Sequence, residues 1–138
     1  MSEQPAPYIA SGLVAMVPVA NIERSASFYA HLGFAIGNRV PQSGTMHWAW
    51  LYMPGFPDWR RGPNLMLTRS DCPIEHAVSR PLYYLYVANL PALHNRLTAA
   101  GLQPGAIHYP DYLPKGECAI EDPEGNRLML AQSDTDTP

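Results

Sequence analysis

The stretch PVANIERSASFYAHLGF, residues 18–34, has a counterpart further along the chain in YVANLPALHNRLTAAGL, residues 86–102. Both stretches contain Val-Ala-Asn near the start, and both end in a glycine followed by a hydrophobic residue. The spacing that relates Val19 to Val87 also relates Gly33 to Gly101. Matched landmarks at one spacing indicate an internal repeat, so we expect the chain to fold as two copies of one structural module.

Each copy carries the signals of a single helix. Asn21 and Asn89 stand where an N-cap side chain accepts a hydrogen bond from a helical N–H. The apolar residues that follow recur every three or four positions, which is the period of one helix face. Gly33 and Gly101 come after the last of them and are typical stops at a helix C-terminus. We therefore expect one helix after each Val-Ala-Asn element.

Apolar runs of strand length surround both predicted helices. One run precedes each helix and three follow it, which predicts a βαβββ module in each copy. The segment DPEGN, residues 122–126, is predicted to be a tight turn before the last strand. The expected strands cover 12–19, 34–40, 46–53 and 64–68 in the first copy, and 81–87, 103–109, 117–121 and 127–131 in the second.

These patterns predict an α+β protein in which two tandem βαβββ modules form a curved, cup-like mixed sheet. We expect the first module at 9–70, a linker at 71–80 and the second module at 81–133, with flexible termini at 1–8 and 134–138.

The composition narrows the class of protein. Of the 138 residues, 46% are hydrophobic, which is enough for a globular interior. A net charge of −3 with scattered basic residues argues against a nucleic-acid partner. No apolar run reaches the roughly 20 residues of a membrane span, and the start of the chain lacks a signal-peptide pattern. Two cysteines without a CxxC pair favour free thiols, so we expect a cytoplasmic protein without a membrane partner.

Alternation along the strands predicts which side chains face a ligand. Along 46–53, Ala49 and Leu51 suit the helix side, which leaves Trp48 and Trp50 on the other face. Indole and phenol groups need polar partners when buried, so they favour a partly open pocket, although aromatic residues also fill ordinary β cores. The candidate ligand-binding residues are Met16, Trp48, Trp50, Met66, Tyr84, Tyr86, Tyr112 and Met129.

Two features of the sequence, a proline-rich loop and a set of polar residues near strand ends, each have a functional and a plainer structural interpretation. Tyr112 lies in HYPDYLPKGE, residues 108–117, a loop that is either a lid over the cavity or a connection made rigid by proline. His47, His108 and Glu117 lie on strands or strand ends and are the candidates for a non-standard catalytic or metal site. The plainer interpretation of the histidines is that His47 shares the face of Ala49 and that His108 ends a strand in solvent.

The duplicated module resembles the vicinal oxygen chelate superfamily, which includes glyoxalase I, extradiol dioxygenases and the fosfomycin- and bleomycin-resistance proteins. The two Val-Ala-Asn stretches and the ending DPEGNRLML carry the resemblance, which spans about residues 12–132. Metal-dependent members place ligands on the first and last strand of each module. The resemblance puts these positions at Val14, Met66, Leu82 and Met129, none of which offers an imidazole or a carboxylate.

The resemblance therefore implies the metal-free, bleomycin-resistance-like branch. We expect a protein that binds a small planar or hydrophobic molecule, without metal or other cofactor, as in antibiotic sequestration. The alternatives are a lyase, isomerase or dioxygenase with a relocated site, and an accessory domain that has lost its ligand. Exposed sheet edges and an apolar concave face, together with the resemblance, also predict a homodimer.

Overall fold

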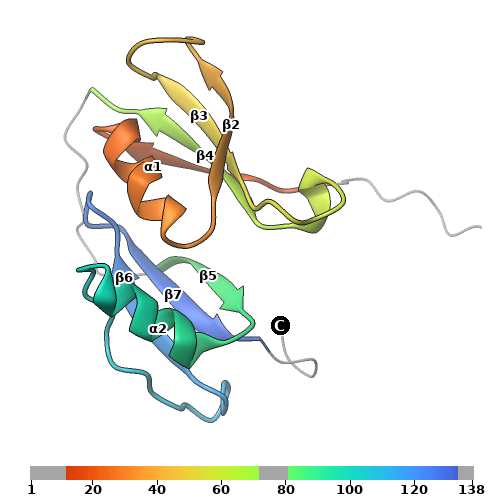
Figure 1. The fold of residues 1–138 in the computed structure, drawn as a ribbon, viewed down its shortest axis with the longest axis vertical. Coiled ribbons are helices and arrows are strands. Elements are labelled where there is room, and N and C mark those ends of the chain that lie inside the picture. Colours follow the sequence, from red (N-terminus) through yellow and green to blue (C-terminus); the bar gives the residue numbers. More distant parts are fainter. Residues whose placement is uncertain (1–11, 72–80, 134–138) are drawn as a thin grey trace, which may run out of the picture.

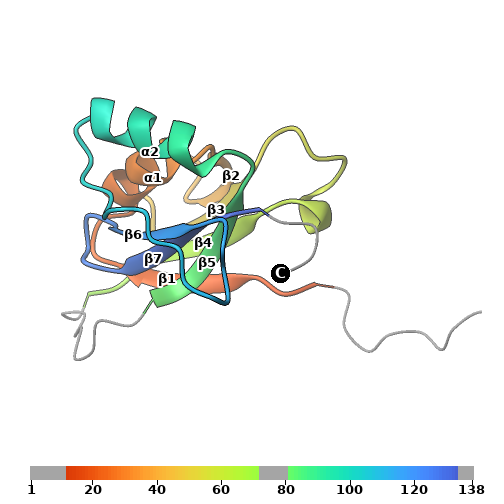
Figure 2. The same cartoon turned by 90° about the horizontal axis from the view of Figure 1, so that it is seen from below.

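The computed structural model describes residues 12–71 and 81–133. Nearly all of the expected linker and both expected flexible termini lie outside these residues. Within them the chain is α+β, with two small sheets and two helices. Figure 1 shows the two modules one above the other, and Figure 2 shows that both helices lie on the same side of the sheets.

The first module has the predicted βαβββ order. Its sheet has the strand order β1-β4-β3-β2, in which β1 runs parallel to β4 and the other pairs are antiparallel. A short 3₁₀ helix, η1, precedes β4. The elements are β1 (Ala15–Val19), α1 (Ile22–Ala30), β2 (Ala35–Val40), β3 (Trp48–Tyr52), η1 (Trp59–Arg61) and β4 (Asn64–Arg69).

The second module has one strand fewer than predicted. Its sheet has the order β5-β7-β6, with β5 parallel to β7. The prediction of a strand at 103–109 is wrong, because within this segment only His108 forms a β-bridge, to Glu117. Pro104 and Gly105 interrupt this segment and Pro110 follows it, and a proline cannot donate to a strand ladder. The elements are β5 (Pro81–Val87), α2 (Leu90–Ala99), β6 (Glu117–Glu121) and β7 (Arg127–Gln132).

The helix ends confirm the repeat at the level of atoms. The side chain of Asn21 accepts a hydrogen bond from the N–H of Arg24 at 2.9 Å, and that of Asn89 accepts one from Ala92 at 3.1 Å. Gly33 and Gly101 adopt φ angles of 100° and 88°, a conformation that glycine takes without strain. The repeated sequence therefore encodes two helices with the same start and the same stop.

The core lies between the helices and the inner faces of the sheets. Ala49 and Leu51 are buried against it as predicted, and Leu67 and Leu130 lie on the same inner faces of β4 and β7. The helix-facing residues of both modules belong to one hydrophobic cluster. The faces that point away from α1 and α2 are called the open faces below: the first belongs to β1–β4 and the second to β5–β7.

Polar contacts join the modules at two places among the described residues. The hydroxyl of Tyr83 on β5 donates to that of Tyr29 on α1, and burial raises the pKa of both phenols. Glu124, in the turn before β7, accepts from the backbone N–H of Ala20 at 3.0 Å and pairs with Arg24 at 2.7 Å. The predicted turn thus reaches the start of the first helix, and it contributes to holding the modules together.

Replacing Glu124 by glutamine is expected to reduce the free energy of unfolding by about 1–2 kcal/mol at pH 7. Burial by itself raises the pKa of Glu124, but the hydrogen bond from Ala20 and the pairing with Arg24 outweigh it, so the pKa is lowered from 4.5. A carboxylate whose pKa is lower in the folded than in the unfolded protein stabilises the fold at pH values above its unfolded-state pKa. This stabilisation is lost as the pH falls through its folded-state pKa. Urea unfolding should therefore show the difference at pH 7 and a smaller one below pH 4.5. Glu121→Gln, at an exposed site, is the control; equal losses in both variants would contradict the prediction.

Candidate functional site

Seven of the eight predicted ligand-binding residues lie on the strands that form the open faces. On the first face, Met66 of β4 lies between Met16 of β1 and Trp50 of β3 in the strand register. On the second, Met129 of β7 lies next to Tyr84 of β5. The repeat therefore places one methionine at the centre of each open face. Met129 is buried, whereas Met16 is more than half exposed.

Trp50 is the centre of an aromatic group on the first open face. Its ring stacks on Tyr52 with centroids 5.1 Å apart and meets Trp59 edge-on at 6.5 Å. Its Nε1–H donates to Asn64 Oδ1 at 3.1 Å, which satisfies the indole. A Cβ at Gly37 would lie 2.4 Å from this ring, so glycine at that position leaves room for the indole over β2.

A hollow of about 260 Å³ lies beside Trp50. It includes Trp59 of η1 and Asn38 of β2, which the sequence interpretation missed. Trp59 belongs to the loop PGFPDWRRGP, where the two copies differ in length, and that difference was the available signal. The hollow is lined by Val14, Asn38, Trp48, Trp50, Trp59 and Met66.

The second open face carries a pair of tyrosines beside a buried carboxylate. The rings of Tyr84 and Tyr86 stack with centroids 6.1 Å apart. Glu117 of β6 is only 2% exposed. Its carboxylate accepts hydrogen bonds from Tyr84 at 3.2 Å, His108 Nε2 at 3.0 Å and Tyr112 at 3.3 Å. The plainer interpretation of His108, as a strand end in solvent, is therefore incomplete: its ring is partly exposed but is held by Glu117.

The carboxylate also affects its neighbours. Burial raises the pKa of Tyr84 to about 12, and the charge of Glu117 adds to this effect. Burial, followed by the same charge, raises the pKa of Cys118 to about 11. Tyr84 therefore stays a hydrogen-bond donor at neutral pH, and Cys118 stays a thiol that faces the core. The exposed side chain of His47 lies in the first module, apart from this cluster.

The four positions that the resemblance assigns to metal ligands carry apolar side chains. Met66 and Met129 are central on the open faces, while Val14 borders the hollow beside Trp50 and Leu82 is exposed. Thioether and aliphatic groups do not form a site for Zn²⁺, Fe²⁺ or Mn²⁺. Within residues 12–71 and 81–133, no three side chains of His, Cys, Asp or Glu gather as metal ligands would.

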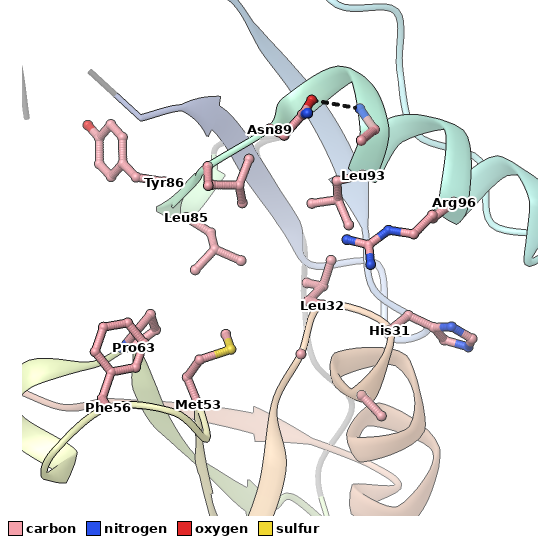
Figure 3. Close-up of a pocket in the computed structure, with 15 residues that line it drawn as sticks. His31, Leu32, Met53, Phe56, Pro63, Leu85, Tyr86, Asn89, Leu93 and Arg96 are labelled. Atoms are coloured by element: carbon pink, nitrogen blue, oxygen red, sulfur yellow. Dashed lines mark hydrogen bonds between the residues drawn. The ribbon is translucent and has the colours of Figure 1, made fainter. Parts of the chain in front are cut away.

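A separate cleft of about 470 Å³ lies between the modules, on the side of the helices. In Figure 3, Met53 and Phe56 of the first module face Leu85 of the second. Its rim includes His31 and Arg96. Among the predicted ligand-binding residues only Tyr86 lines it. The sequence did not reveal this cleft, because its walls come from segments far apart in the chain.

No helix among the described residues is long and apolar enough to cross a membrane. A comparison with curated protein sequences finds no match.

Solved structures with the same fold include proteins that bind antibiotics. A bleomycin-binding protein in complex with bleomycin is 20% identical, with a TM-score of 0.68 over 91% of this chain and 100% of that one. TnmS3, an antibiotic binding protein from Streptomyces, is 21% identical, with a TM-score of 0.68 over 94% and 100%. TioX from Micromonospora is 18% identical, with a TM-score of 0.69 over 89% and 98%. At these identities the likeness shows the fold.

The sequence itself matches a family model over residues 13–130, which includes both modules. The chain belongs to the glyoxalase/bleomycin resistance protein/dioxygenase superfamily.

Proposed function

We propose that this protein binds a small planar or hydrophobic molecule on its aromatic open faces without using a metal ion, and that the binding serves antibiotic sequestration. The observation that carries the proposal is the chemistry of the open faces. Aromatic and thioether side chains stand there, and the four positions of the family's metal ligands are apolar. Such surfaces favour binding by stacking and apolar contact over Lewis-acid catalysis.

The structural neighbours support this proposal through their reported ligands. One of them was solved with bleomycin bound, and another is described as an antibiotic binding protein. In the present chain, the ring pairs Trp50–Tyr52 and Tyr84–Tyr86 offer flat surfaces for an aromatic ligand. Methionine side chains adapt their shape to different ligands, which suits Met16 and Met66 for the floor of such a site.

The binding form in this proposal is a homodimer. The open faces expose Met16, Leu82, Tyr84 and Tyr86, whose exposed fractions lie between 38% and 55%. Contiguous apolar surface of this kind is typical of interfaces and ligand sites. Two copies packed through these faces would enclose a cavity between modules.

One observation favours the alternative, a lyase, isomerase or dioxygenase with a relocated site. A buried carboxylate that accepts a hydrogen bond from His108 Nε2 fixes the ring and leaves Nδ1 available as a general base. The contact between Glu117 and His108 has this geometry. Turnover that disappears in His108→Ala would support the alternative over simple sequestration.

The proposed function is tested by titrating planar compounds, including bleomycin, into the purified protein by calorimetry. We expect at least one compound to bind below millimolar concentration, with no change when divalent metals are added or chelated. Light scattering on the same sample should report a dimer rather than the 15.3 kDa chain. Binding that requires about one metal ion per chain would contradict the metal-free proposal, and a monomer at micromolar concentration would contradict the dimer.

A further inference from the structure

Glu117 differs in its surroundings from Glu121, the other carboxylate on the strands of the second sheet. Glu121, at the other end of β6 and on the same face, is exposed, whereas Glu117 is 2% exposed. Burying a carboxylate is costly unless hydrogen bonds or a positive charge compensate for it. The donors to Glu117 are two phenols and the imidazole of His108, which is charged only when it is protonated. The carboxylate is thus held mostly by groups without a permanent charge.

Two of these three donors cover the carboxylate from the solvent side. The side chain of His108 is 56% exposed, and Tyr112 is 64% exposed. Turning them away would break two hydrogen bonds of 3.0 and 3.3 Å. Tyr84, the third donor, belongs to the sheet itself. The cover over Glu117 is therefore formed by ring ends that can rotate without a change in the strands.

The position of Glu117 links it to the aromatic surface of the second open face. In the strand register, Ala131 lies between Tyr86 on one side and Glu117 on the other. Tyr84, which stacks on Tyr86, reaches the carboxylate with its hydroxyl at 3.2 Å. A flat molecule lying on these two rings would bring a substituent at its edge to the oxygens of Glu117. The side chain between them is that of Ala131, which is small and fully buried.

We propose that Glu117 anchors a cationic group of the planar ligand, an amine, amidinium or aminoacridinium edge that replaces His108 and Tyr112 on the carboxylate. This inference rests on the proposed function and assigns its ligand class. Electrostatic attraction to the carboxylate and attraction of the cation to the faces of Tyr84 and Tyr86 act together at this place. Neutral molecules of the same shape gain only the stacking.

The experiment compares two tricyclic probes of similar size, cationic proflavine and neutral acridone, by calorimetry at pH 7. The wild-type protein should bind proflavine at least tenfold more tightly than acridone, since hydrogen bonds between charged groups exceed neutral ones. Glu117→Gln should remove most of this preference and leave acridone binding within about twofold. Glu121→Gln removes the same charge from the same strand face, and it should change neither affinity.

Further variants separate anchoring from a purely structural role. Tyr112→Phe removes a donor that the cation must displace from Glu117, so it should tighten proflavine binding. If Glu117→Gln does not fold, Glu117→Asp keeps the charge but shortens its reach, and it should reduce the preference for proflavine. Equal wild-type affinities for the two probes, or an equal loss of both in Glu117→Gln, would overturn the anchor while leaving the proposed function in place. If neither probe nor any compound of the wider panel binds, both proposals fall.

Discussion

Replacing Trp50 by alanine is expected to weaken binding of a planar ligand about 30-fold, or roughly 2 kcal/mol, the scale of a tryptophan hot spot. Trp50 stacks on Tyr52, meets Trp59 and borders the hollow on the first open face. Its ring is half-buried on the side away from the helices, so the loss of stability should be smaller than the loss of affinity. Calorimetric titration measures the loss of affinity, and urea unfolding measures the loss of stability.

Trp50→Phe is the matched variant for this test. It keeps a flat ring over Gly37 but loses the Nε1–H that donates to Asn64. The amide of Asn64 in turn donates to the carbonyls of Trp59 and Gly62. Trp50→Phe therefore removes a hydrogen bond that supports the loop around Trp59 while it keeps a ring for stacking. We expect Trp50→Phe to retain most of the affinity. If Trp50→Ala unfolds the protein, or loses as much free energy of unfolding as of binding, the ring is part of the core and the prediction is wrong.

The second large effect concerns stability. Replacing Asp122 by alanine is expected to reduce the free energy of unfolding by about 2–4 kcal/mol, because buried donors lose their acceptor. The buried carboxylate of Asp122 accepts from the backbone N–H groups of Glu124 and Asn126, both at 2.9 Å, and from the side chain of Asn126 at 2.9 Å. These bonds shape the turn that carries Glu124 to the first module.

The control for Asp122 is asparagine at the same position. Asp122→Asn keeps one oxygen for the two backbone N–H groups and loses only the bond from the Asn126 amide, so we expect a loss of about 1 kcal/mol. Chemical denaturation of the three proteins gives the comparison. Alanine and asparagine variants of equal stability would show that these hydrogen bonds contribute little. The same Asp122→Ala change can also be made in a protein that already carries Arg24→Ala and Glu124→Ala. If Asp122→Ala lowers the free energy of unfolding in the wild type but not in this double variant, the effect comes from the contact between the modules.

Local pattern predicted most of the secondary structure. The N-caps at Asn21 and Asn89 and the glycine stops depend on hydrogen bonds within a few residues, and they were found where expected. Alternation correctly assigned Ala49 and Leu51 to the core, since neighbouring strand residues point to opposite faces. The prediction of a strand at 103–109 failed because this segment, which contains Pro104, pairs with β6 only through single contacts at Gly105 and His108.

The candidate site, too, has parts that the sequence predicted and parts that only the tertiary structure shows. The sequence by itself determined the duplicated module, the methionines in the middle of the open faces and the aromatic side chains around them, because these depend on period and repeat. Only the tertiary structure decided that Tyr84, His108 and Tyr112 meet on the carboxylate of Glu117. Tyr84 is 33 residues from Glu117, and no local rule relates the two positions. The pairing of β5 and β6 with β7 and the path of the loop before β6 bring these groups together, and these are long-range contacts that folding alone establishes.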